Sequence, residues 1–96
     1  MNGTERIAAE RKRQIEQEGW TPNHDAQHAR GELALAAICY LLYGDDPDRR
    51  NVPASWPWDG EWWKPKDRLS NLVRAGALIA AEIDRMIDAP GEESER

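Results

Sequence analysis

The chain has no phenylalanine, a single cysteine and no apolar run long enough to cross a membrane. One cysteine cannot form an internal disulfide, so Cys39 is expected to be a small buried hydrophobe in a reducing compartment. The longest apolar run, residues 33–43, has 11 residues, whereas a membrane span needs about 20. No apolar segment follows Met1, so no signal peptide is expected. These absences predict a cytoplasmic protein that has no membrane partner.

Basic charge is also scarce. The sequence has 18 acidic and 13 basic residues and a net charge of −5. Non-specific binding of DNA or RNA depends on neutralising phosphates, so this balance argues against a nucleic-acid polymer as the partner. With 96 residues, the chain is one domain near the small end of what holds a core unaided. Self-association is a common remedy for small scaffolds, and we expect a homodimer or a higher homo-oligomer.

Recognised catalytic patterns are missing as well. The sequence contains no glycine-rich phosphate loop, no Ser/His/Asp set and no Cys/His pair. Helical nucleoside-triphosphate pyrophosphohydrolases bind magnesium through paired Glu-x-x-Glu and Glu-x-x-Asp motifs. The spacing of Glu32, Glu82, Asp84 and Asp88 does not reproduce those motifs, so a metal-dependent nucleotide hydrolase is the least favoured alternative. We predict a binding protein that is not an enzyme and carries no cofactor.

Hydrophobic periodicity and capping residues predict three helices and an all-α fold. The first helix covers residues 5–18, with Thr4 as its cap and Gly19 ending it in a left-handed conformation. The second helix covers residues 22–43 and is apolar on every side from Leu33 onward, which predicts a central buried helix. Three residues are alternative caps for its start: Thr21 before Pro22, Asn23 or Asp25.

The third helix covers residues 67–88 and has apolar residues at three- and four-residue spacing, whereas Arg74 and other charged residues lie mainly away from that face. The expected single domain is a compact bundle of the three helices, with a long ordered loop at residues 44–66 and a frayed tail at residues 89–96. Six residues of the second and third helices are predicted to be among the most buried: Leu35, Ile38, Leu42, Leu72, Ile79 and Ile83.

Tryptophan is abundant, and four of the five tryptophans fall within residues 56–63. A disordered segment avoids aromatic residues, so the loop is expected to be ordered, with a short helical turn near residues 59–63. In one interpretation the indoles cover a core that is too small to close itself. In the other, the surplus forms an aromatic wall for a flat ligand, because stacking on an aromatic face contributes about 1–3 kcal/mol per base.

The second interpretation predicts a site for a small anionic, nucleotide-like ligand. Trp20, Trp62 and Trp63 would supply stacking surfaces. Lys64, Lys66 and Arg68 would contact the anionic group. His24 and Asp25 would contact ribose or other polar groups, and Thr21, next to Trp20 in the sequence, is a further predicted ligand-binding residue.

Two histidines and a carboxylate share one side of the predicted second helix, since His24, His28 and Glu32 are four residues apart. Such a set can hold zinc or another transition metal. The motif lacks the glutamate that metalloproteases place next to the first histidine as a base. Capping and polar contacts to the neighbouring loop are the favoured interpretation, and we predict no metal.

Three blocks of the sequence resemble a family of small proteins encoded by phages and prophages. The blocks are Glu18-Gly19-Trp20-Thr21-Pro22-x-His24-Asp25 with the charged residues before it, residues 56–67 with Trp56-Pro57-Trp58-Asp59 and Trp62-Trp63-Lys64-Pro65-Lys66-Asp67, and residues 72–83. This resemblance covers nearly the whole chain and implies an infected or lysogenic bacterial host. Small non-enzymatic phage proteins often disable host defences, either by sequestering a nucleotide signal or by capping a host protein. A weaker similarity, limited to Gly19-Trp20 and scattered charges, is to the domain repeated in ryanodine receptors.

Two functions therefore compete. The leading hypothesis is a protein that sequesters a nucleotide-like ligand, such as a host defence signal. The alternative is an inhibitor or adaptor that binds a host protein, with tryptophans as interface anchors. A pocket enclosed by Trp20 and the loop would favour the ligand, and a flat exposed tryptophan patch would favour the protein partner.

Overall fold

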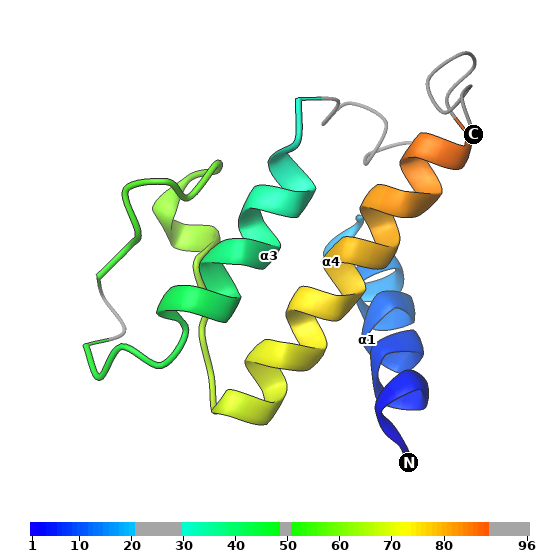
Figure 1. Ribbon diagram of the computed structural model, residues 1–96, viewed down its shortest axis with the longest axis horizontal. Helices are drawn as coiled ribbons and strands as arrows, with labels where there is room; N and C mark the ends of the chain where they lie inside the picture. The colour runs from blue at the N-terminus through cyan, green and yellow to red at the C-terminus, as the bar shows by residue number, and fades with distance from the viewer. Residues whose placement is uncertain (21–29, 49–50, 89–96) are drawn as a thin grey trace.

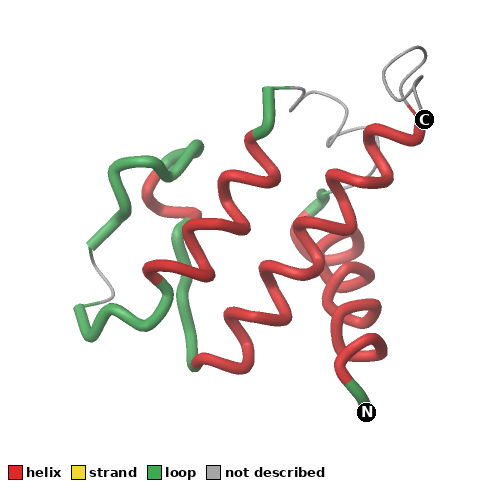
Figure 2. Tube along the Cα trace, viewed as in Figure 1, coloured by secondary structure: helices red, strands yellow, loops and turns green. Residues whose placement is uncertain are grey.

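The computed structural model describes residues 1–20, 30–48 and 51–88. Within these ranges the elements are α1 (Gly3–Glu18), α3 (Glu32–Tyr43), the 3₁₀ turn η1 (Gly60–Trp62) and α4 (Arg68–Asp88), as Figures 1 and 2 show. The described residues contain helices and loops but no strand, which confirms the all-α prediction. None of the described helices has the length and apolar character needed to cross a bilayer.

Helix α4 is the centre of the arrangement, because it packs against both α1 and α3. Helices α3 and α4 run antiparallel side by side, and α1 lies behind α4 in the view of Figure 1. The loop that joins α3 to α4 returns along α3 and carries η1, which confirms the helical turn expected near residues 59–63. Its Trp56 Nε1 donates a hydrogen bond of 3.1 Å to the carbonyl of Asp59, so the loop is ordered by its own contacts.

Helix α1 begins earlier than predicted because Asn2, and not Thr4, is its cap. The Asn2 side chain accepts a hydrogen bond from the backbone N–H of Glu5, and the Glu5 carboxylate accepts one from the backbone N–H of Asn2, both at 2.8 Å. This reciprocal pair is a capping box. Gly19 ends the helix with φ +74°, which confirms the predicted left-handed residue.

The predicted continuous helix of residues 22–43 is interrupted at Gly31. Gly31 has φ +85°, a left-handed conformation that interrupts a helix, and α3 begins only at Glu32. The Glu32 carboxylate accepts a hydrogen bond of 2.8 Å from the backbone N–H of Arg30. The three caps considered for the start of this helix lie outside the described residues.

Asn71 joins the end of α3 to the start of α4. Its side chain donates hydrogen bonds to the carbonyls of Gly44 (3.1 Å) and Lys66 (2.9 Å) and accepts one from the Lys66 N–H (2.7 Å). Gly44 permits this close approach, since a Cβ atom there would lie 2.5 Å from Asn71 Nδ2. Asp67 accepts hydrogen bonds from the backbone and hydroxyl of Ser70, so α4 starts within one residue of the predicted boundary.

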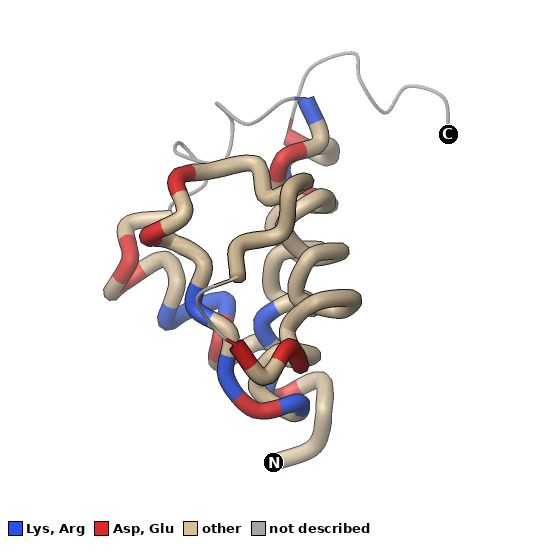
Figure 3. Tube along the Cα trace, turned by 90° about the vertical axis from the view of Figure 1, so that its left-hand side faces the viewer, with Lys and Arg blue, Asp and Glu red and all other residues tan. Residues whose placement is uncertain are grey.

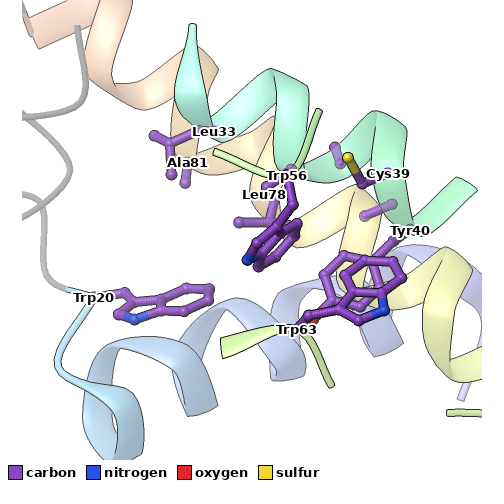
Figure 4. Close-up of a cluster of buried hydrophobic side chains, with 11 residues drawn as sticks. Trp20, Leu33, Cys39, Tyr40, Trp56, Trp63, Leu78 and Ala81 are labelled. Atoms are coloured by element: carbon purple, nitrogen blue, oxygen red, sulfur yellow. The ribbon is translucent and has the colours of Figure 1, made fainter. Parts of the chain in front are cut away.

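The core lies where α3 and α4 meet the tryptophan loop, and small side chains of the helices face large aromatic rings of the loop (Figure 4). Tyr40 stacks on Trp63 with ring centroids 4.8 Å apart, and Trp56 contacts Trp63 edge-on at 4.9 Å. The apolar core residues are Trp20, Leu33, Ala36, Ala37, Cys39, Tyr40, Trp56, Trp63, Ala75, Leu78 and Ala81.

The core predicted from helical periodicity is wrong. Leu35 is only half-buried, and the other five predicted residues are exposed: Ile38, Leu42, Leu72, Ile79 and Ile83. Periodicity identifies residues that share one side of a helix, but it does not say which side meets the rest of the chain. Here the alanine-rich sides of α3 and α4 turn inward, because the indoles that cover them already fill the available volume.

Candidate functional site

The tryptophans form an aromatic cluster that belongs mainly to the core. Trp20, Trp56 and Trp63 are buried and Trp58 is half-buried, whereas Trp62 is 39% exposed. Trp58 connects the cluster, with ring centroids 5.7 Å from Trp20 and 5.4 Å from Trp56. The indoles therefore cover the core, as the first interpretation of the loop predicted, and only Trp62 is largely available at the surface.

Beside this cluster, charged side chains of α1 and α4 form a polar junction. The Arg13 guanidinium donates two hydrogen bonds of 2.8 Å to the Glu10 carboxylate, and it pairs with Glu18 at 2.7 Å. Arg74 of α4 lies 3.8 Å from the same Glu10 carboxylate. Gln14 is fully buried and donates a hydrogen bond of 3.1 Å to Glu10. Charges of opposite sign thus neutralise each other, as buried charges require.

Arg74 connects the junction to the loop and to α3. Its guanidinium donates hydrogen bonds to the carbonyl of Lys64 and to the Tyr40 hydroxyl, and it lies 5.3 Å from the centroid of the Tyr40 ring. The Lys64 N–H donates to the same hydroxyl at 3.4 Å. Arg74 was predicted to lie away from the apolar side of its helix. It does so, but that direction is the interior of the protein.

The surroundings of Glu10 and Arg13 in the junction stabilise the ionised form of each side chain. Burial alone would raise the pKa of Glu10, but the hydrogen bonds and charge of Arg13, together with Gln14 and Arg74, lower that pKa below the ordinary value. The hydrogen bond to Glu10 likewise raises the pKa of Arg13. Glu10 therefore stays ionised and paired near neutral pH, which is a poor state for a general base.

A small cavity lies where the junction meets the cluster. Its volume is about 10 Å³, and its walls include Gln14, Trp20, Trp62 and Lys64. The buried Oε1 atom of Gln14 has no hydrogen-bond partner among the described residues. Ligand pockets occupy about 300–1,000 Å³, so this space matches one water molecule and not a nucleotide.

The structure brings together only some of the residues predicted to bind a ligand. Trp20, Trp62 and Lys64 line the small cavity, and the Lys64 ammonium lies 5.2 Å from the centroid of the Trp62 ring. Trp63 is buried against Tyr40, which removes it as a stacking surface. The exposed side chains of Lys66 and Arg68 lie at the start of α4, where Arg68 pairs with Asp45 at 3.2 Å. Thr21, His24 and Asp25 lie outside the described residues.

A metal site receives no support from the described part of the chain, where no three His, Cys, Asp or Glu residues gather in a suitable group. Glu82 instead pairs with Arg85 at 2.9 Å, and Asp84 lies 3.9 Å from Arg11. His24 and His28, which would share a site with Glu32, lie outside the described residues.

A second hollow, of about 280 Å³, lies between α1 and α4. Arg6, Arg13, Glu10 and Ser70 contribute its polar groups, and Leu69 and Val73 contribute apolar walls. Of these groups, Arg13 is already engaged by Glu10 and by Glu18.

Sequence reasoning missed an exposed apolar surface on α3 and α4, which we call the α3–α4 face. It consists of eight side chains: Ile38, Leu41 and Leu42 of α3, and Leu69, Leu72, Ile79, Ile83 and Met86 of α4. Each of them is 38–65% exposed. On both helices these residues lie away from the sides that bury Tyr40 and Leu78, and the two helices are neighbours. Figure 3 marks the acidic and basic residues along the backbone, and residues 33–43 of α3 include none of them.

The chain matches none of the protein-family models, curated proteins or solved structures with which it was compared.

Proposed function

We propose that the protein is a non-enzymatic protein-interaction module and that it acts through the α3–α4 face. The observation that carries this proposal is the exposure of eight large apolar side chains on two neighbouring helices. Single exposed apolar residues are ordinary, but a contiguous patch of them marks an interaction site or an aggregation hazard. The proposal corresponds to the inhibitor or adaptor hypothesis, with aliphatic side chains in the role that the sequence suggested for tryptophan.

The distribution of large side chains supports an interaction role. Leu33 and Leu78 are the leucines in the core, whereas α4 alone exposes Leu69, Leu72, Ile79 and other aliphatic residues. These side chains are 38–65% exposed, so a partner that buried one fully would gain about 0.6–2 kcal/mol for it. A partner that covers the face would recover part of this free energy.

The electrostatics of the polar junction support a role other than catalysis. Glu10 is ionised and paired with Arg13, and Arg74 is committed to the Lys64 carbonyl and Tyr40 hydroxyl. Groups engaged in this way hold α1, α4 and the loop together. The resemblance to phage and prophage proteins agrees with a role in binding and would place the partner in a bacterial host.

Site-specific photo-crosslinking tests the proposal. A photoreactive amino acid replaces Ile79 or Ile83 on the face, or Lys12, which is exposed on α1, and the protein is irradiated in living bacteria. We expect a covalent adduct with a polypeptide from both face positions and none from Lys12. Equal labelling at all three positions, or no adduct from Ile79 and Ile83, would contradict the proposed function.

A small anionic ligand remains the second candidate, and one contact favours it. The Lys64 ammonium lies over the exposed Trp62 ring, so a cation and an indole face are presented together at the surface. The small neighbouring cavity would admit one functional group and not a whole nucleotide.

A further inference from the structure

We propose that the partner of the α3–α4 face is a second copy of this chain. The α3–α4 pair of one chain would then pack face to face against the α3–α4 pair of the other, which gives a four-helix arrangement in two layers. This inference rests on the proposed function, because it names the partner of the same surface. Three properties of the face support it, namely its spacing, its charge and its area.

The spacing on α4 is that of a coiled-coil seam. Leu69, Leu72, Ile79, Ile83 and Met86 occupy alternating steps of three and four residues when Gly76 is counted in the series. Alternating steps of three and four are typical of helices that pack against other helices, and Val73, Ala80 and Ile87 widen this stripe by one neighbouring apolar position per turn pair. On α3, Leu35, Ile38 and Leu42 repeat the same steps of three and four.

Gly76 is the one position of this series that has no side chain. A Cβ atom at Gly76 would lie 2.6 Å from the Cδ1 atom of Ile7, so the α1 side chain occupies the space next to that position. Ile7 is itself half-buried. The seam is therefore bordered by α1 at its middle and is otherwise uncovered within the described chain.

The charge of the face fits self-association better than a foreign partner. The whole chain carries a net charge of −5, so two copies repel each other over most of their surfaces. A two-fold interface places each patch against itself, and a charged patch would oppose like charges. Residues 33–43 of α3 contain no charged side chain, and none of the eight residues of the face is charged. Binding to a different protein is commonly steered by charged residues around the interface. Self-association of an uncharged face does not require such residues.

The area of the face is sufficient for a specific dimer. Burying a Leu, Ile or Met side chain completely removes roughly 60–120 Å² of apolar surface from water. Eight side chains at 38–65% exposure therefore present roughly 200–450 Å² of apolar surface per chain. Interfaces at the low end of specific ones bury about 600 Å² per partner, of which about 60% is apolar. The apolar part of such an interface is about 360 Å², which the upper part of the range for this face reaches, so a weak, reversible dimer is expected.

Sedimentation equilibrium of the purified full chain tests the inference at protein concentrations from about 1 to several hundred µM. The expected mass at high concentration is twice the chain mass of 11.0 kDa. Ile79→Glu should return the mass to that of one chain, because it buries a carboxylate against its own copy. Gln17→Glu adds the same charge at an exposed position of α1 and should leave the dimer unchanged.

Leu42→Glu is the second disrupting variant, because Leu42 is 65% exposed and contributes little to the fold of one chain. Retained helical circular dichroism in this variant, together with a single-chain mass, supports the inference even if Ile79→Glu fails to fold. A wild-type mass of one chain at every concentration would overturn the inference. Adducts from Ile79 and Ile83 to other polypeptides would then leave the proposed function standing. A dimer that persists in both variants would overturn the assignment of the interface to this face.

Discussion

Three polar side chains are buried among the described residues, Gln14, Asn71 and Arg74, and the last two join separate elements. Arg74 reaches from α4 to the loop and to Tyr40, and Asn71 binds both ends of the loop between α3 and α4. Asn71 and Arg74 satisfy backbone carbonyls that would otherwise be buried without a partner, whereas Gln14 donates to the Glu10 carboxylate. Their sequence context gave no sign of this role, because polar residues in an amphipathic helix usually face water.

Replacing Asn71 by alanine should reduce the free energy of unfolding more than the same replacement at Asn51. Asn71→Ala leaves the carbonyls of Gly44 and Lys66 and one N–H without their present partner, so it should cost about 2–3 kcal/mol of unfolding free energy. Asn51→Ala makes the same chemical change at an exposed position and should stay within about 0.5 kcal/mol. Urea denaturation measures both values, and equal midpoints for the two variants would argue against the role of Asn71.

Glu10 should make stability depend on pH. Its pKa is lower in the folded protein than its ordinary value of 4.5, so its contribution is fully present above pH 4.5. The contribution is lost as the pH falls below that value through the folded pKa. Glu10→Gln should cost about 1–2 kcal/mol at pH 7, and the difference from wild type should shrink in acid.

Denaturation of wild type and Glu10→Gln at pH 7 and pH 3 measures that difference. Glu16→Gln, which removes an exposed carboxylate from the same helix, serves as the control. A difference between wild type and Glu10→Gln that stays constant from pH 7 to pH 3 would show that ionisation of Glu10 does not stabilise the fold.

Lys64 tests the second candidate function. Its side chain is exposed, so Lys64→Ala should leave the thermal melt nearly unchanged. If a small anion binds beside Trp62, indole fluorescence should respond to a panel of mono-, di- and cyclic nucleotides. The Lys64→Ala variant should then bind the active compound more weakly. No fluorescence change and no thermal shift with any compound would eliminate this candidate.

At the scale of elements, α4 has two apolar sides of different character. The inner side bears Ala75, Leu78 and Ala81, which permit close contact with α3 and the indoles, and the outer side bears larger aliphatic residues. The sequence pattern is strong for the outer side because large side chains dominate any measure of hydrophobicity. This is why the periodicity selected the exposed face as the core.

Substitution of adjacent residues on α4 distinguishes the two sides. Leu78 is fully buried, so Leu78→Ala should cost about 2–5 kcal/mol. Ile79 is 43% exposed, so Ile79→Ala should cost less than about 1 kcal/mol. Chemical denaturation in dilute solution, where association is minimal, compares them directly, and a larger loss for Ile79→Ala would refute the observed orientation of α4.

At the scale of the whole molecule, the fold places its aromatic cluster on one side of the α3–α4 pair and leaves aliphatic residues on the other side. A domain of 96 residues buries a smaller share of its surface than a larger one. The uncovered side therefore represents apolar surface that a single chain does not use. Association through this side would complete a second apolar layer.

Thermal stability should consequently depend on protein concentration. Only folded chains form the dimer, so a higher protein concentration favours the folded state. The Tm of the wild type should therefore rise as the concentration increases from about 1 to 100 µM. Leu42→Glu, which places a charge on the face, should melt at a temperature that does not vary over that range. Differential scanning calorimetry provides the measurement, and a concentration-independent wild-type Tm would contradict dimerisation.

The sequence alone determined the local features of this protein. Gly19 as a left-handed stop, the turn near Gly60 and the bounds of α4 all follow from short-range steric and hydrogen-bonding preferences. Only the tertiary structure decided which side of each helix is buried, and with it the location of the α3–α4 face. The physical reason is that burial depends on what packs against a side, and here the indoles of the connecting loop cover the alanine-rich side of α3 and α4. The same packing buries Trp20 and Trp63, two of the predicted stacking residues, in the core.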